Sequence, residues 1–137
     1  MFTLPTKLAI PTKSYINRFN VCITNMEAKQ LLDHTKIIFN SADLVYSNKD
    51  YTSATILYFK TLFSIFDFIL LQTQGKVPKD HTERFRMLER HNPDIYEFLD
   101  KYFKIYRDTY TISIDRETCN EIRENIKRII KKYNIQI

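Results

Sequence analysis

Apolar residues recur every three or four positions along most of this chain, which is the spacing of one face of a helix. Thr24 and Glu27 match a capping box, in which the two side chains satisfy backbone N–H groups at a helix start. The pattern therefore predicts a first long helix over residues 24–46. Its inward stripe is Ala28, Leu31, Leu32, Thr35, Ile38, Phe39, Ala42 and Val45.

The next helical segment, from about Asp50 to Thr73, is apolar nearly all round, which is typical of a helix buried by several neighbours. Gly75 is its natural end, because glycine accepts the left-handed conformation at a helix C-terminus. The run ATILYFKTLFSIFDFILL contains Lys60 and Asp67. A membrane span needs about 20 mostly uncharged residues, so we predict a buried core helix and no membrane association.

Three further helices are predicted in the second half of the chain. A short, charged helix spans about residues 80–90, with Asp80 and Glu83 at its start. Asn92 can cap the following helix, and Pro93 suits its first turn. That helix reaches about Asp108, and a basic helix follows from near Asp115.

These elements predict an all-α fold. Four substantial helices joined by short loops favour an up-and-down antiparallel four-helix bundle, here with one extra short helix. The motifs LPTK and IPTK, six residues apart, favour extended structure around Pro5 and Pro11. We therefore predict an extended N-terminal arm over residues 1–22 and a single bundle domain over residues 23–137.

Composition narrows the possible functions. The 137 residues include one glycine, so neither a P-loop nor a glycine-rich dinucleotide fingerprint can be present. The net charge of +5 is concentrated toward the C-terminus and permits an anionic partner. The N-terminus lacks the pattern of a secretory signal. Cys22 and Cys119 form neither a disulfide framework nor a zinc motif, and a cytoplasmic location fits them.

The order of several short motifs resembles the HEPN family (higher eukaryotes and prokaryotes nucleotide-binding), over roughly residues 25–134. The residues that carry the resemblance are Ala54, Tyr58, Gly75, Pro78, His81, Arg107 and Tyr110. The resemblance implies a helical bundle, often a homodimer. It also implies a minimal nucleotidyltransferase as partner, in toxin–antitoxin or related pairs. Some members are metal-independent ribonucleases whose site is an arginine, four to six residues, and then a histidine.

The stretch HTERFRMLERHNPD contains two pairs with that spacing, Arg86 with His91 and Arg84 with His91. On an ideal helix Arg86 and His91 point about 140° apart, whereas Arg84 comes back within about 20° of His91 but lies two turns away. Neither pair is a ready phosphate clamp. The stretch therefore also fits an ordinary helix with a basic outer face.

Five residues are candidates for nucleotide binding: Arg107, Tyr110, Lys60, Asp67 and His81. Arginine supplies planar donors for phosphate, and tyrosine supplies a stacking face. Lys60 and Asp67 share one face of the most apolar helix, so each needs solvent or a partner from another helix. Asp67 alternatively holds a tyrosine hydroxyl or a basic side chain.

Three functions follow from these expectations. The first is a non-catalytic, HEPN-like module that binds a nucleotide or a nucleotidyltransferase. The second is a ribonuclease toxin acting on RNA through Arg84 or Arg86 with His91. The third is a purely structural or interaction bundle. We expect no cofactor, and no metal because His34, His81 and His91 lack metal-ligand spacing.

Overall fold

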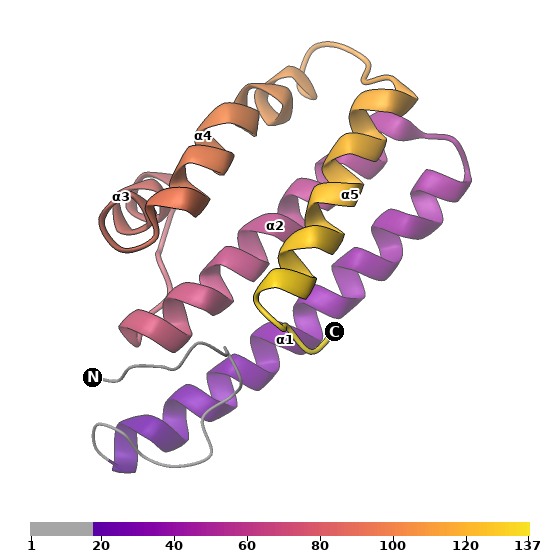
Figure 1. Ribbon diagram of the computed structural model, residues 1–137. Coiled ribbons are helices and arrows are strands. Elements are labelled where there is room, and N and C mark those ends of the chain that lie inside the picture. Colours follow the sequence, from indigo (N-terminus) through magenta and orange to yellow (C-terminus); the bar gives the residue numbers. More distant parts are fainter. Residues whose placement is uncertain (1–17) are drawn as a thin grey trace.

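A computed structural model describes residues 18–137, with side chains described from Met26 onward, as an all-α helical bundle. The helices are α1 (Arg18–Ser47), α2 (Tyr51–Gln74), α3 (His81–His91), α4 (Pro93–Asp108) and α5 (Arg116–Lys132). The chain runs up α1, down α2, up α4 and down α5, with short α3 between α2 and α4 (Figure 1). The predicted fold class is confirmed.

The first helix begins earlier than the capping box predicted. α1 starts at Arg18, so residues 18–22 belong to the helix and not to an arm. No proline or glycine stands between Pro11 and α1, so nothing forces the helix to begin at Thr24. The remainder of the predicted arm, residues 1–17, lies outside the described residues.

Most of the other predicted helix ends are confirmed. Asp50, Asp80 and Asp115 each accept a hydrogen bond from a backbone N–H three residues later. Gly75 ends α2 in the left-handed conformation, with φ of 81°. Asn92 is an exception, since its side chain makes no capping bond. Its backbone serves both helix ends instead, donating to Leu88 and accepting from Tyr96.

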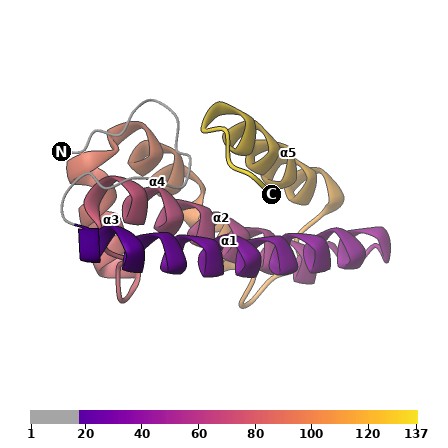
Figure 2. The same ribbon diagram turned by 90° about the horizontal axis from the view of Figure 1, so that it is seen from below.

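α2 is the central element of the fold and packs against each of the other four helices. Every residue from Thr61 to Gln72 is buried. α1 lies antiparallel along its whole length, while α3 with α4 and α5 cover different parts of α2 (Figure 2). The all-round apolar pattern of this segment is thereby explained, because each face of α2 has a neighbour.

Among the described residues, α2 alone combines the length and hydropathy of a membrane span. In its most apolar window, 83% of the residues are buried inside the protein. Burial of this extent is what the core helix of a soluble protein shows, and it supports the prediction of a buried core helix.

Candidate functional site

A buried ion pair joins α2 to α3. Arg84 Nε donates to Asp67 Oδ1 at 2.7 Å, and a terminal nitrogen of the same guanidinium donates to Oδ2 at 2.9 Å. The two side chains are only 10% and 11% exposed. Burial raises the pKa of Asp67, while the bonds and charge of Arg84 oppose that rise. The expected partner of Asp67 from a neighbouring helix is therefore Arg84.

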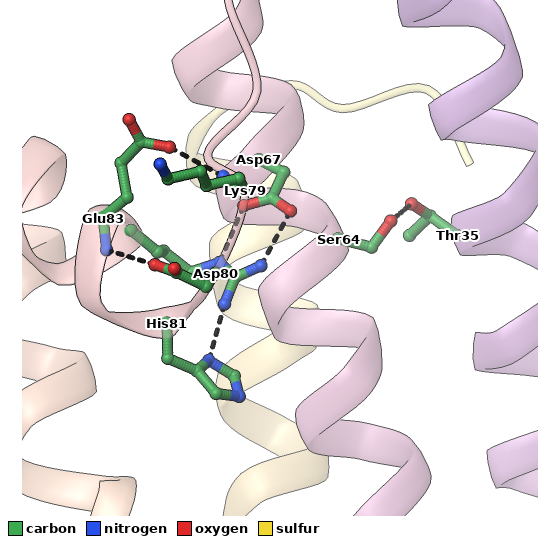
Figure 3. Close-up of polar contacts among 8 residues, drawn as sticks. Thr35, Ser64, Asp67, Lys79, Asp80, His81 and Glu83 are labelled. Atoms are coloured by element: carbon green, nitrogen blue, oxygen red, sulfur yellow. Dashed lines mark hydrogen bonds and ion pairs between the residues drawn. The ribbon is translucent and has the colours of Figure 1, made fainter.

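His81 lies one turn before Arg84 on α3 and extends this pair. Its Nδ1 is 2.6 Å from a terminal nitrogen of Arg84 (Figure 3). Because a guanidinium can only donate, Nδ1 must accept, and the imidazole is neutral with its proton on Nε2. Burial, and then the charge of Arg84, lower the pKa of His81, in agreement with this assignment. The second ring nitrogen points away from the ion pair and remains a hydrogen-bond donor.

Helix α3 is anchored so that His81 and Arg84 face α2. Asp80 Oδ1 accepts from the Glu83 backbone N–H at 2.8 Å, and Glu83 Oε1 accepts from the Lys79 backbone N–H at 2.7 Å (Figure 3). These reciprocal bonds resemble a capping box shifted by one residue. They fix the first turn, and thereby the direction in which His81 and Arg84 leave the helix.

An aromatic wall from α2 and α4 supports these polar groups. The Arg84 guanidinium lies 5.0 Å from the centre of the Phe63 ring. The His81 ring meets Phe63, Phe103 and Tyr106 edge-to-face, with centroids 4.7, 5.5 and 6.0 Å away. Such contacts favour a fixed ring orientation. Phe63 and Tyr106 belong to the core, since they are only 6% and 7% exposed.

The outer end of this wall is exposed. Tyr110 is 71% exposed, although its ring lies 5.7 Å from Tyr106 and its hydroxyl donates to Tyr106 Oη at 3.3 Å. Arg107 is also exposed, with its guanidinium 5.9 Å from the centre of the Phe103 ring. Among the described residues no carboxylate lies within ion-pair distance of Arg107, so its charge is uncompensated at short range.

Lys60 belongs to the same region. It is exposed, and its charge is among those that lower the pKa of His81. The preceding residue, Phe59, packs on Tyr106 with centroids 5.4 Å apart. We name the surface part of this region the aromatic–cationic face. Its exposed residues are Lys60, His81, Arg107 and Tyr110, which lie over Phe103 and the buried Tyr106.

The five residues predicted to bind a nucleotide thus gather around one aromatic cluster, but in two roles. Lys60, His81, Arg107 and Tyr110 reach the surface. Asp67 is buried and neutralised by Arg84, so it positions His81 through that arginine and is not a surface contact. Sequence reasoning did not connect Arg84 with His81, although their i, i+3 spacing places them on one face.

A separate hollow of about 300 Å³ lies on the outer side of α3. Its lining residues are Gln74, Lys76, Glu83, Arg86, Met87, Arg90 and His91. Arg86 and His91 therefore border one hollow, although their Cα–Cβ bonds point about 140° apart on an ideal helix. Arg84 does not line it, since its donors are committed to Asp67 and His81.

The fold and the site together define an all-α bundle in which a buried Asp67–Arg84 pair is joined to His81 at an exposed aromatic and cationic surface. Within the described residues, no group of three histidine, cysteine, aspartate or glutamate side chains is arranged to hold a metal ion. No protein-family model, curated protein or solved structure matches the chain. The resemblance to the HEPN family therefore stays a prediction.

Proposed function

We propose that the protein is a non-catalytic binding module that holds a nucleotide on the aromatic–cationic face. The observation that carries the proposal is the exposure of Tyr110, a large ring held against Tyr106 with most of its surface open. A base can stack on such a platform, and stacking contributes about 1–3 kcal/mol per base. The ring is already oriented by its neighbour, so little ordering is needed on binding.

The charges around Tyr110 suit the phosphate of such a ligand. Arg107 offers planar paired donors, and Lys60 adds a second mobile cation. His81 contributes a neutral N–H donor from Nε2, because its Nδ1 is occupied by Arg84. This arrangement leaves His81 without a free lone pair to accept a proton, which supports binding without catalysis.

Calorimetric titration with ATP tests the proposal. We expect saturable binding that Tyr110→Ala and Arg107→Gln each weaken by about tenfold, the fold-change that corresponds to about 1.4 kcal/mol. Arg86→Gln is the matched control, since this arginine is exposed on α3 outside the face. The proposal is wrong if titration with nucleoside triphosphates gives no heat of binding. It is also wrong if Arg86→Gln weakens binding as much as Tyr110→Ala and Arg107→Gln do.

A second candidate function is ribonuclease activity in the hollow on α3, because Arg86 and His91 both border it. Lys76 and Arg90 line the same hollow and would attract an RNA phosphate. Metal-free cleavage of RNA that His91→Ala abolishes would support this function. Intact RNA after incubation with the wild-type protein would leave binding as the function.

We also propose a cytoplasmic homodimer with a nucleotidyltransferase partner, as the HEPN resemblance implies. One surface supports an interaction: Met26, Ile37 and Leu44 on α1 are 65%, 64% and 66% exposed. Their separations of eleven and seven residues are close to whole helical turns, so they lie on one side of α1, with the exposed polar residues Asp33 and Ser41 between them. Light scattering should give twice the chain mass, reduced to the monomer by Leu44→Lys. A wild-type monomer would contradict the homodimer.

A further inference from the structure

A groove separates α4 from α5 on a different part of the molecule from the aromatic–cationic face. No Cα atom of α4 lies within 8 Å of a Cα atom of α5. The space between the two helices forms a cavity of about 320 Å³. Its lining residues are Phe66, Asp94, Ile95, Phe98, Asn125, Arg128, Ile129, Lys132 and Tyr133. This volume is at the lower end of the range for small-molecule sites.

Side-chain bridges connect the two helices along the groove. The Tyr102 hydroxyl donates to Glu121 Oε2 at 2.7 Å. Nearer the C-terminus of α5, Asp94 Oδ2 accepts from the Tyr133 hydroxyl at 3.1 Å and from Lys132 Nζ at 3.4 Å. These bridges divide the space between the helices into a short compartment. A compact molecule fits such a compartment better than a helix or an extended peptide does.

The interior of the groove is mainly apolar. Phe66 of α2 lies behind the two helices, Ile95 and Phe98 contribute from α4, and Ile129 contributes from α5. Phe66 and Ile95 are buried in the core, and they connect the groove to it. These side chains would accept an aliphatic or aromatic group and gain from removing it from water.

The polar rim is uneven in charge. Lys132 is already paired with Asp94. Arg128 is exposed, and among the described residues no carboxylate lies within ion-pair distance of it. Its one hydrogen bond goes to Asn125 Oδ1. A guanidinium without a counter-ion beside apolar walls favours an anion that carries an apolar body.

Asn125 accepts the hydrogen bond from Arg128 and positions the guanidinium at the edge of the groove. This side chain lines the groove although only 9% of the residue is exposed. Its Nδ2 makes no hydrogen bond with any described residue. That nitrogen is itself closed off from the groove, so a ligand oxygen reaches it only when the Asn125 side chain turns, and the exposed Arg128 guanidinium is the primary polar contact.

We propose that the groove between α4 and α5 binds a small organic monoanion, a carboxylate with an aliphatic or aromatic body. The carboxylate pairs with Arg128 next to the Asn125 amide, and the body lies against Phe66, Phe98 and Ile129. The site does not depend on the proposed nucleotide function, because it shares no residue with the aromatic–cationic face.

The experiment uses naphthalene-2-carboxylate as the probe and 2-naphthalenemethanol as its neutral counterpart. Titrations are followed by calorimetry and by backbone amide chemical shifts of the full chain. We expect the carboxylate to bind with a dissociation constant on the order of 0.1–1 mM, as a ligand of this size allows. The neutral alcohol should bind about tenfold more weakly. Shift changes should be concentrated in α4 and α5.

Arg128→Gln removes the charge from an exposed position and should leave the fold intact. The variant should weaken binding of the carboxylate by about tenfold, so that its dissociation constant comes close to that of the alcohol. Arg116→Gln, an exposed arginine at the start of the same helix, is the matched control and should change nothing.

Three results would overturn the proposal: no binding of the carboxylate at 10 mM, which is about ten times the weakest expected dissociation constant, equal binding of the alcohol, or equal weakening by the Arg128 and Arg116 variants. Shift changes that centre on Tyr110 would place the probe on the aromatic–cationic face and also contradict the site. ATP should not displace the probe, and a nucleotide titration that fails would leave this test unaffected.

Discussion

Two arginines that stand two residues apart on α3 have opposite environments. Arg84 is buried, with its guanidinium bonded to both oxygens of Asp67 and to His81. Arg86 is exposed and borders the hollow on the outer side of the helix. A separation of two residues turns the side chain by about 200° on a helix. Residue type therefore says little here about function, and the position on the helix decides it.

The largest expected effect is the loss of the buried arginine. Arg84→Ala leaves Asp67 buried without a partner, which should lower the free energy of unfolding by about 3–5 kcal/mol. Arg86→Ala should change it by less than about 0.5 kcal/mol. Urea unfolding followed by circular dichroism measures both variants. Equal losses would mean that the two environments differ less than the structure indicates.

A double substitution tests whether stability depends on the buried charges of Asp67 and Arg84 themselves or only on neither charge being left unpaired. In Asp67→Leu with Arg84→Met, no buried charge is left unpaired, and apolar groups of similar size fill the space. We expect the double variant to recover most of the loss and to unfold within about 2 kcal/mol of the wild type. His81 then loses the donor to its Nδ1. If the nucleotide proposal holds, ATP binding should weaken while stability is kept.

Much of the fold around the two arginines was predictable from the sequence, and what could not be predicted has a physical cause. Helical periodicity predicted the bundle and helix starts near Asp50 and Asp80, and the charge of Asp67 within an apolar helix predicted its need for a partner or solvent. It did not give the identity of that partner, because periodicity orders residues within a helix and says nothing about which helices meet. The same limit applies to the groove between α4 and α5, whose lining comes from three helices.

The start of α1 shows a different limit. A capping box satisfies backbone donors where a helix begins, but it does not stop residues before it from being helical. The ideal angle between Arg86 and His91 has a limit of another kind. It describes the directions of the Cα–Cβ bonds, whereas long side chains at a helix end reach a shared hollow.

A smaller effect is expected from the cap that orients both arginines. Asp80 accepts from the backbone N–H of Glu83 at the start of α3. Asp80→Ala should cost about 1 kcal/mol, as the loss of an N-cap usually does. Asp80→Asn should restore most of it, because its side-chain oxygen still accepts. Thermal unfolding of the two variants provides the measurement, and equal melting temperatures would show that the cap does not hold α3.

The smallest expected effect is a dependence of stability on pH that comes from His81, on the side of α3 that carries Arg84. Burial and the charge of Arg84 hold the pKa of His81 below its ordinary value of 6.5. The unfolded chain therefore takes up this proton first as the pH falls, and stability is lost from about pH 6.5 down to the folded pKa. Above pH 7.5 both states hold a neutral imidazole, so the histidine contributes no slope there. Lys60, Asp67 and Asp80 also act on His81, and the two carboxylates partly offset the cations.

His81→Asn isolates this contribution. Asparagine places an oxygen near the position of Nδ1, so it can accept from Arg84 but does not titrate. Between pH 7.5 and pH 5.0 the wild type should lose more stability than this variant, as followed by urea unfolding at each pH. Parallel curves for His81→Asn and the wild type would show that His81 keeps an ordinary pKa, and that its contact with Arg84 does not make stability depend on pH.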